Sequence, residues 1–232
     1  GRGGSAASGG PAAQPSGGRG APGSAGGGPA SLPARDGGKT IGWSQRYAHP
    51  CAHRGEGGAS IAVVSIDDTR SQATAAAVRA TRGYQSGVHY WEVQVLALSD
   101  CSFVGLVSSE WSALHAPVGR APESWGVASN GAVFACQEEV MRLSHGYGEG
   151  SIVGVLLELG GQRQRTATVF IDGRRYDDLF ADLPETLYPA VSNMRLPAQY
   201  SLTCNASLPE EEAGQGAPEP PPPPPPAPAE PP

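Results

Sequence analysis

The stretch Gly87–Val95, GVHYWEVQV, decides the fold that we predict for this chain. Successive side chains of a β-strand point to opposite faces, so one face receives His89, Trp91, Val93 and Val95. The other face receives Tyr90, Glu92 and Gln94. One mainly apolar face and one mainly polar face are typical of an antiparallel strand that covers a core on one side. We therefore interpret this stretch as scaffold and not as a catalytic strand.

Similar segments lie on both sides of it along the chain. Aliphatic and β-branched runs, separated by Gly, Pro, Asn and Asp, occupy Ser60–Ile66, Val88–Val95, Phe103–Val107, Ser151–Leu159, Thr166–Asp172 and Leu187–Ser192. Asp172-Gly173 and Asn130-Gly131 are typical of hairpin turns, where glycine readily adopts a positive φ. Thr74–Arg82 is rich in alanine, but it runs into a strand without a C-cap, so no helix is expected. The pattern predicts an all-β antiparallel sandwich.

The two ends of the chain differ in composition from the middle. Residues 1–38 contain 14 glycines and no aromatic residue, and residues 209–232 are Pro, Ala, Glu and Gly apart from Gln215. Large apolar side chains must offset the entropy lost on folding, so we expect both ends to be disordered. The predicted organisation is a Gly/Ala-rich arm at 1–42, a β-sandwich with an N-terminal extension at 43–208, and an acidic, Pro-rich tail at 209–232.

The net charge and the cysteines indicate which kinds of binding partner and which cellular compartment to expect. The formal net charge is −6, and residues 59–208 carry ten Lys/Arg against fifteen Asp/Glu, which gives −5. Nucleic-acid-binding surfaces are usually basic, so we expect no nucleic acid partner. The sequence shows no h-region and no run of 18 apolar residues, so we expect no signal peptide and no membrane association. Four widely spaced cysteines are expected to be reduced, in the cytoplasm or nucleus.

The segment His49–His53, HPCAH, has residues that commonly bind metal ions. A zinc site needs four ligands, usually from two separated pairs, and no second pair is evident in the sequence. Cys101, Cys136 and His145 are the remaining residues that could converge on it in space. We expect a plain loop here, with no metal and no cofactor.

Two adjacent carboxylate pairs, Asp67-Asp68 and Asp177-Asp178, could suggest acid–base chemistry. Neighbouring side chains on a strand point to opposite faces, so neither pair converges on one substrate atom, and Asp favours turns at strand ends. The glycine-rich N-terminus ends in Gly38-Lys39-Thr40, but Pro33 stands where the phosphate-binding loop G-x-x-x-x-G-K-[ST] has its first glycine. We therefore expect no catalytic residues and no enzyme.

Taken in order, several motifs give the chain a resemblance to a known family. The motifs are GYQSGVHYWEV at 83–93, FVGLV at 103–107, SWG at 124–126, GEGSIVGVLL at 148–157, TVFIDGRR at 168–175 and LYPAVS at 187–192. With these motifs the sequence resembles a SPRY domain over roughly Ser60 to Leu208. The resemblance implies a twisted sandwich of two antiparallel sheets, with Trp91, Val93 and Val95 packed between them. It also implies a non-enzymatic role in protein–protein interaction.

Within that family, VGRAPESWG at 118–126 is most similar to the SOCS-box-associated SPRY proteins. In those proteins a peptide docks on loops at one end of the sandwich. The likeness implies a partner-binding site here at Asp68, Thr69, Arg70, Leu114, His115, Met194 and Arg195. The family has an aromatic residue where Leu114 stands and Trp-Gly where Arg195-Leu196 stand, so a different peptide is expected. Residues 209–232 form a proline-rich tract, so we expect no SOCS box, and a part in substrate recognition for a ubiquitin ligase is a hypothesis.

Two further segments are open to more than one interpretation. Trp111 lies in a polar loop between two signature strands, and it is either a lid on the core or an exposed secondary anchor for the partner. Pro220–Pro226 is an unbroken proline run, which adopts the extended polyproline II conformation. It is either a ligand for a proline-reading domain or a spacer.

The main alternative to a binding module is a carbohydrate-binding or hydrolytic β-sandwich, because sandwiches host unrelated functions. A glycosidase would require two carboxylates facing each other across a groove, about 5–9.5 Å apart.

The composition of the two ends predicts that neither is needed for folding. A chain shortened to about Trp43–Leu208 should melt at the temperature of the full chain, because the removed residues supply no apolar side chains to a core. Thermal unfolding followed by circular dichroism measures this. A loss of several degrees on removing Gly1–Gly38 would contradict the prediction.

Overall fold

The computed structural model describes residues 41–55, 61–64, 75–98, 101–160, 165–194 and 197–209. Every helix or strand assigned among these residues is a β-strand, as the sequence pattern predicted. The alanine-rich segment around Thr74–Arg82 contains a strand, β4, and not a helix. No helix in the described ranges is long and apolar enough to span a membrane.

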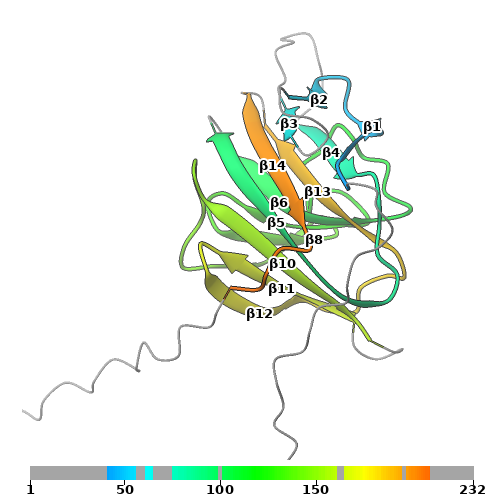
Figure 1. Ribbon diagram of the computed structural model, residues 1–232, viewed down its shortest axis with the longest axis vertical. Coiled ribbons are helices and arrows are strands. Elements are labelled where there is room, and N and C mark those ends of the chain that lie inside the picture. Colours follow the sequence, from blue (N-terminus) through cyan, green and yellow to red (C-terminus); the bar gives the residue numbers. More distant parts are fainter. Residues whose placement is uncertain are drawn as a thin grey trace, which may run out of the picture. The chain divides into compact units, whose positions relative to one another are not determined.

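The described strands form two antiparallel sheets of seven strands each, which confirms the predicted sandwich (Figure 1). The first sheet has the spatial order β1 (Trp43–Ala48), β4 (Ala76–Ala80), β13 (Leu187–Asn193), β6 (Ser102–Ser108), β7 (Ser124–Ala128), β8 (Ala132–Ala135) and β9 (Glu138–Arg142). The second sheet has the order β12 (Arg174–Phe180), β11 (Arg165–Ile171), β10 (Ile152–Leu159), β5 (Gly87–Leu98), β14 (Ala198–Cys204), β3 (Ile61–Val64) and β2 (Ala52–Arg54).

Strand β5 contains the stretch on which the prediction was based, and it lies in the interior of the second sheet. It pairs with β10 on one side and with β14 on the other, so Trp91 lies opposite both Val155 and Cys204. Trp91, Val93 and Val95 are 0% exposed, as expected for residues packed between two sheets. The predicted scaffold role of this strand is therefore confirmed.

The outward face of β5 is less polar than the sequence pattern suggested. Tyr90 is only 2% exposed and packs with Leu156 and Phe170, which β10 and β11 place on the same face. Its ring meets that of Phe170 edge-on, with centroids 5.7 Å apart, and its hydroxyl donates a hydrogen bond to Glu92 Oε1 at 3.0 Å. This small second cluster was not visible from β5 alone, because its other members come from neighbouring strands.

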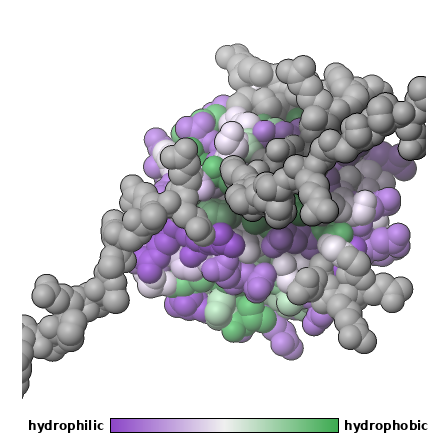
Figure 2. Space-filling model, turned by 60° about the horizontal axis from the view of Figure 1, so that its bottom comes forward, coloured by the Kyte–Doolittle hydropathy of each residue, from purple (hydrophilic) through white to green (hydrophobic). Residues whose placement is uncertain are grey.

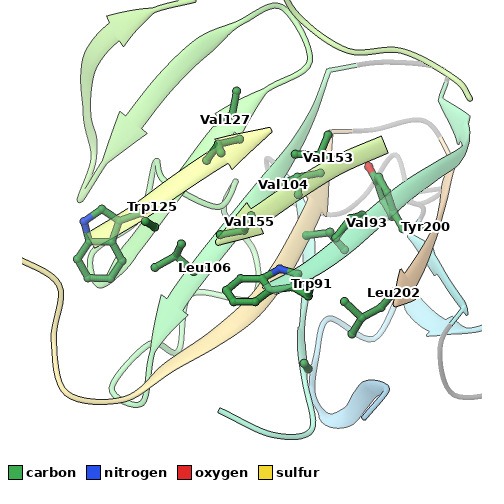
Figure 3. Close-up of a cluster of buried hydrophobic side chains, with 14 of the residues drawn as sticks. Trp91, Val93, Val104, Leu106, Trp125, Val127, Val153, Val155, Tyr200 and Leu202 are labelled. Atoms are coloured by element: carbon green, nitrogen blue, oxygen red, sulfur yellow. The ribbon is translucent and has the colours of Figure 1, made fainter. Parts of the chain in front are cut away.

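The main core lies between the two sheets, where side chains of the second sheet face Val104, Leu106, Trp125 and Val127 of the first (Figure 3). The second sheet contributes Trp91, Val93, Val153, Val155, Tyr200 and Leu202. Complete burial of a Val or Leu side chain stabilises the fold by about 1.5–3 kcal/mol. A core of this size therefore determines where the strands of both sheets must lie.

The turns follow the sequence signals. Asp172 and Gly173 have φ angles of 50° and 82°, which is the positive-φ pair that a tight β11–β12 hairpin requires. The Asp172 carboxylate also accepts hydrogen bonds from Ile152 N at 2.8 Å and from Ser151 Oγ at 2.9 Å. Gly131 likewise has a positive φ, 84°.

Few large apolar side chains are exposed among the described residues. Those that are come from four separate segments: Val88, Val140 with Met141, Ile152 and Leu208. On the face shown in Figure 2, hydrophilic residues cover much of the described surface, and hydrophobic residues form small patches. No large apolar patch marks a binding surface on the described residues, so the candidate recognition groups are those of the loops and the buried polar side chains.

The close approach of β6 and β7 generates a stability prediction. Gly105 lies opposite Gly126, and a Cβ atom on Gly105 would overlap the carbonyl oxygen of Trp125. Gly105→Ala should therefore lower the free energy of unfolding by about 1–3 kcal/mol or more, since overpacking forces the strands apart. Urea unfolding measures the loss. The matched control is Gly148→Ala, whose added Cβ has no neighbour within 4 Å, and an equal loss in both variants would contradict this account.

Candidate functional site

Three connecting segments are anchored together at one end of the first sheet, where β4 begins and β13 ends. Asn193 pairs with Ala76 of β4 and with Ser102 of β6. The backbone amide of Ala77 donates to Leu114 O at 3.1 Å, and that of Ala75 donates to His115 O at 3.2 Å. The hydrogen bonds therefore bring the chain before β4 and the loop after β6 to the end of β13. We call this region the loop end.

The loop end contains three of the predicted site residues. Leu114 and Met194 are partly buried against the outer side of the first sheet, and His115 is exposed. The amide of Met194 donates to Cys101 O at 3.1 Å, which holds the end of β13 beside the start of β6. The other predicted residues, Asp68, Thr69, Arg70 and Arg195, lie outside the described residues.

The loop between β6 and β7 has a fixed conformation over the outer side of the first sheet. The amide of Val118 donates to Ser192 Oγ at 2.8 Å, and the amide of Gly119 donates to Ser124 Oγ, also at 2.8 Å. A Cβ on Gly126 would come within 2.7 Å of Val118 O, so this glycine lets the loop lie directly on β7. A loop held in this way presents its exposed side chains in a defined arrangement.

Trp111 belongs to this loop and is 2% exposed. It packs in an outer cluster with Ala77, Phe103, Val107 and Val118, on the side of the first sheet that faces away from the second. This geometry fits a lid on the sheet, and it does not present the indole as an exposed anchor. The buried Nε1 has no hydrogen-bond partner among the described residues.

The histidine of HPCAH that lies deepest, His49, is joined to the loop end and not to a metal cluster. It is 4% exposed, its amide donates to Ala77 O at 2.8 Å, and its Nδ1 accepts a hydrogen bond from Cys51 N at 3.0 Å. Its ring meets that of His115 edge-on, with centroids 4.7 Å apart. In the described part of the chain, no group of three or more His, Cys, Asp or Glu side chains is arranged to hold a metal ion.

The environment of His49 opposes its protonation. Burial in the protein and, to a smaller extent, the charge of His115 lower the pKa of His49 below its ordinary value of 6.5. The Nδ1 acceptor also favours the neutral ring, since this nitrogen would lose its hydrogen bond from Cys51 on protonation. His49 is therefore a neutral link between β1 and the loop end near neutral pH.

The carboxylates considered for acid–base chemistry have structural roles where they are described. Asp177 forms an ion pair with Arg175 at 2.6 Å, and Asp178 has a φ of 42°, as expected of a residue at an irregular point of a strand. Asp67 and Asp68 lie outside the described residues. The four cysteines are not joined by disulfides, and Cys51, Cys101 and Cys204 are partly buried while Cys136 is exposed.

Sequence reasoning missed one residue on the outer side of the first sheet, Arg79. It is 4% exposed, although it carries a charge, and its guanidinium carbon lies 3.6 Å from the ring centroid of Tyr47 and 4.0 Å from that of Tyr188. Its Nη1 donates to Ser108 O at 3.3 Å. A desolvated cation–π contact contributes about 2 kcal/mol. No sequence signal marks this site, because the tyrosines come from β1 and β13, 32 residues before and 109 residues after Arg79.

Comparison with known proteins gives consistent matches to one family. A family model of the SPRY domain matches residues 88–208. Among solved structures, the chain is similar to the SPRY domain of human HERC1, with a TM-score of 0.56, 18% identity, and coverage of 69% of this chain and 96% of that chain. A human SPRY domain gives a TM-score of 0.54, 19% identity, and coverage of 68% and 98%.

A third similar structure is the PSpry domain of TRIM65, with a TM-score of 0.50, 17% identity, and coverage of 71% of this chain and 92% of that chain. At these identities the solved structures support the fold alone. No curated protein matches the chain significantly.

His49 predicts how stability depends on pH. Because its folded-state pKa lies below 6.5, the unfolded chain takes up the proton first as the pH falls, and acid favours unfolding. The contribution of His49 is complete above pH 6.5 and is lost as the pH falls through the lowered pKa of the folded state. The parent should therefore lose more stability between about pH 7 and pH 5 than His49→Asn, which keeps an acceptor for the Cys51 amide.

Urea unfolding at several pH values measures this difference. The matched control is His53→Asn, which changes an exposed histidine of the same segment and should keep the pH dependence of the parent. Equal slopes for the parent and His49→Asn would show that the buried histidine contributes nothing.

Proposed function

The chain belongs to the SPRY domain family of protein-interaction modules, and we propose from this premise that it binds a peptide or loop of a partner protein without catalysing a reaction. The single observation that supports this most is the geometry of the loop end. The segments that carry Leu114, His115 and Met194 are held together there by backbone hydrogen bonds. Loops on a rigid sandwich are where recognition residues are usually found.

In this proposal the partner's peptide contacts Asp68, Thr69, Arg70, Leu114, His115, Met194 and Arg195. Leu114 and Met194 supply apolar area, since both are only partly buried against the outer cluster. Arg70 and Arg195 bind acidic side chains, because the planar guanidinium pairs a carboxylate through two hydrogen bonds. The peptide is therefore acidic or of mixed charge.

We also propose a wider role for the chain as the substrate-recognition part of a ubiquitin ligase, in the cytoplasm or nucleus. The support is the local likeness of VGRAPESWG at 118–126 to the SOCS-box-associated SPRY proteins. The proline run Pro220–Pro226 would offer a second docking segment, for a domain that reads polyproline II. Affinity capture with the full chain, compared with a chain lacking residues 209–232, separates partners of the sandwich from partners of the tail.

The proposal predicts the effect of removing the Arg195 side chain. Truncating a central interface anchor costs about 2 kcal/mol or more, and 1.4 kcal/mol corresponds to tenfold in affinity. Arg195→Ala should therefore weaken binding of the captured partner at least about tenfold. It should leave the melting temperature unchanged. Binding is measured by surface plasmon resonance and folding by thermal unfolding.

The matched control is Arg174→Ala. It removes an exposed arginine in the β11–β12 hairpin of the other sheet and should change neither quantity. If the double variant Arg70→Ala, Arg195→Ala binds the partner as tightly as the parent does, the partner docks elsewhere on the chain.

A further inference from the structure

Arg79 is a buried cation that has no carboxylate partner among the described residues. The ion pairs among the described residues join Arg142 to Glu139 and Arg175 to Asp177, and neither involves Arg79. Its Nη1 donates to a backbone carbonyl, and its Nε is buried without any hydrogen-bond partner in the described part of the chain. Buried charged groups are normally paired, so one that is 96% buried and incompletely bonded requires an explanation.

The two tyrosines determine from which direction a partner could reach the guanidinium. The ring centroids of Tyr47 and Tyr188 lie 3.6 Å and 4.0 Å from Cζ of Arg79, and both rings make cation–π contacts with the guanidinium. Nη1 is already used by Ser108 O. The edge formed by Nε and Nη2 is therefore the one left for a partner. Its two parallel N–H groups match the two oxygens of a carboxylate that lies in the guanidinium plane.

The site also lies at the surface and is positively charged. Both tyrosines are only partly buried, and side-chain rotamer changes at an interface are common when proteins bind. Tyr188 is packed closely on Gly83, where an added Cβ would come within 2.7 Å of the ring. Tyr47 belongs to the edge strand β1, and the exposed Arg46 lies 5.4 Å from its ring and adds a second positive charge.

We propose that Arg79, between Tyr47 and Tyr188, is a receptor for one carboxylate side chain of an acidic peptide segment of the partner protein. The inference rests on the proposed function, because the ligand is part of a protein partner. The Arg79 site would be a second anchor for the partner, on the outer side of the first sheet and further along β4 than the loop end. Ala77, at the loop end, and Arg79 point to the same side of that strand.

The test is a titration of the full chain, labelled with ¹⁵N, followed by the side-chain Nε–Hε signal of Arg79. The probe is acetyl-Glu₆-amide, and acetyl-Gln₆-amide is the uncharged comparison. The Arg79 signal should move saturably with the glutamate peptide and stay in place with the glutamine peptide. Arg79→Lys keeps the charge and loses the planar fork, and it should bind the glutamate peptide at least about tenfold more weakly.

The matched control is Arg142→Lys, which changes an exposed arginine on β9 and should bind the probe as the parent does. A purely structural Arg79 would lower the melting temperature on substitution and leave the peptide affinity unchanged, which would overturn the proposal. An Arg79 signal that does not move with the glutamate peptide would also overturn it. If the Arg79 signal moves with inorganic phosphate and not with the glutamate peptide, the proposed carboxylate ligand is wrong and a phosphorylated ligand is indicated instead.

Variants of Arg70 and Arg195 separate this inference from the proposed function. If Arg70→Ala, Arg195→Ala loses the glutamate peptide while Arg79→Lys retains it, Arg79 is not the receptor and the loop-end proposal stands. If Arg79→Lys loses the peptide while the double variant retains it, Arg79 is the receptor and the loop end is not the acidic-peptide site.

Discussion

The rest of the sandwich depends on β5, which must be hydrogen-bonded along both edges and packed on both faces. Both of its edges are hydrogen-bonded, to β10 and β14, and both of its faces are packed. Trp91, Val93 and Val95 fill the space between the sheets, and Tyr90 packs with Phe170 on the outer side. With β5 fixed in this way, β10 and β14 have one register each, and the inner face of the second sheet determines where the first sheet can pack.

The first sheet is packed on both sides as well, and this connects the core to the candidate site. Its inner side faces the main core, and its outer side is covered by the β6–β7 loop through Trp111 and Val118. The glycines at 105 and 126 make both contacts close, one with the neighbouring strand and one with the loop. The loop end is therefore supported by residues that themselves touch no ligand in the proposal.

The sequence alone predicted much of this fold, because the strongest strands carry their own signal. Alternation in β5 and the Asp172-Gly173 turn depend on neighbours in sequence, and both were predicted correctly. Strand β14 was missed, although Ala198, Tyr200 and Leu202 alternate inward, because only two of its seven side chains, Tyr200 and Leu202, are large and apolar. Arg79 could not be predicted, since its two tyrosines join it only after β1, β4 and β13 have become neighbours. The burial of Tyr90 was hidden for the same reason.

The burial of Arg79 also bears on how the chain finds its strand register. All five residues of β4 are buried, and the other four are Ala76, Ala77, Val78 and Ala80, so polarity distinguishes the two sides of this strand at only one position. A slip of one residue would exchange the sides and place the guanidinium between the sheets, among Trp43, Val104 and Leu187. An unpaired charge there would be strongly disfavoured, whereas the small apolar residues would fit either side. A single arginine thus opposes one-residue slips of β4 against β1 and β13.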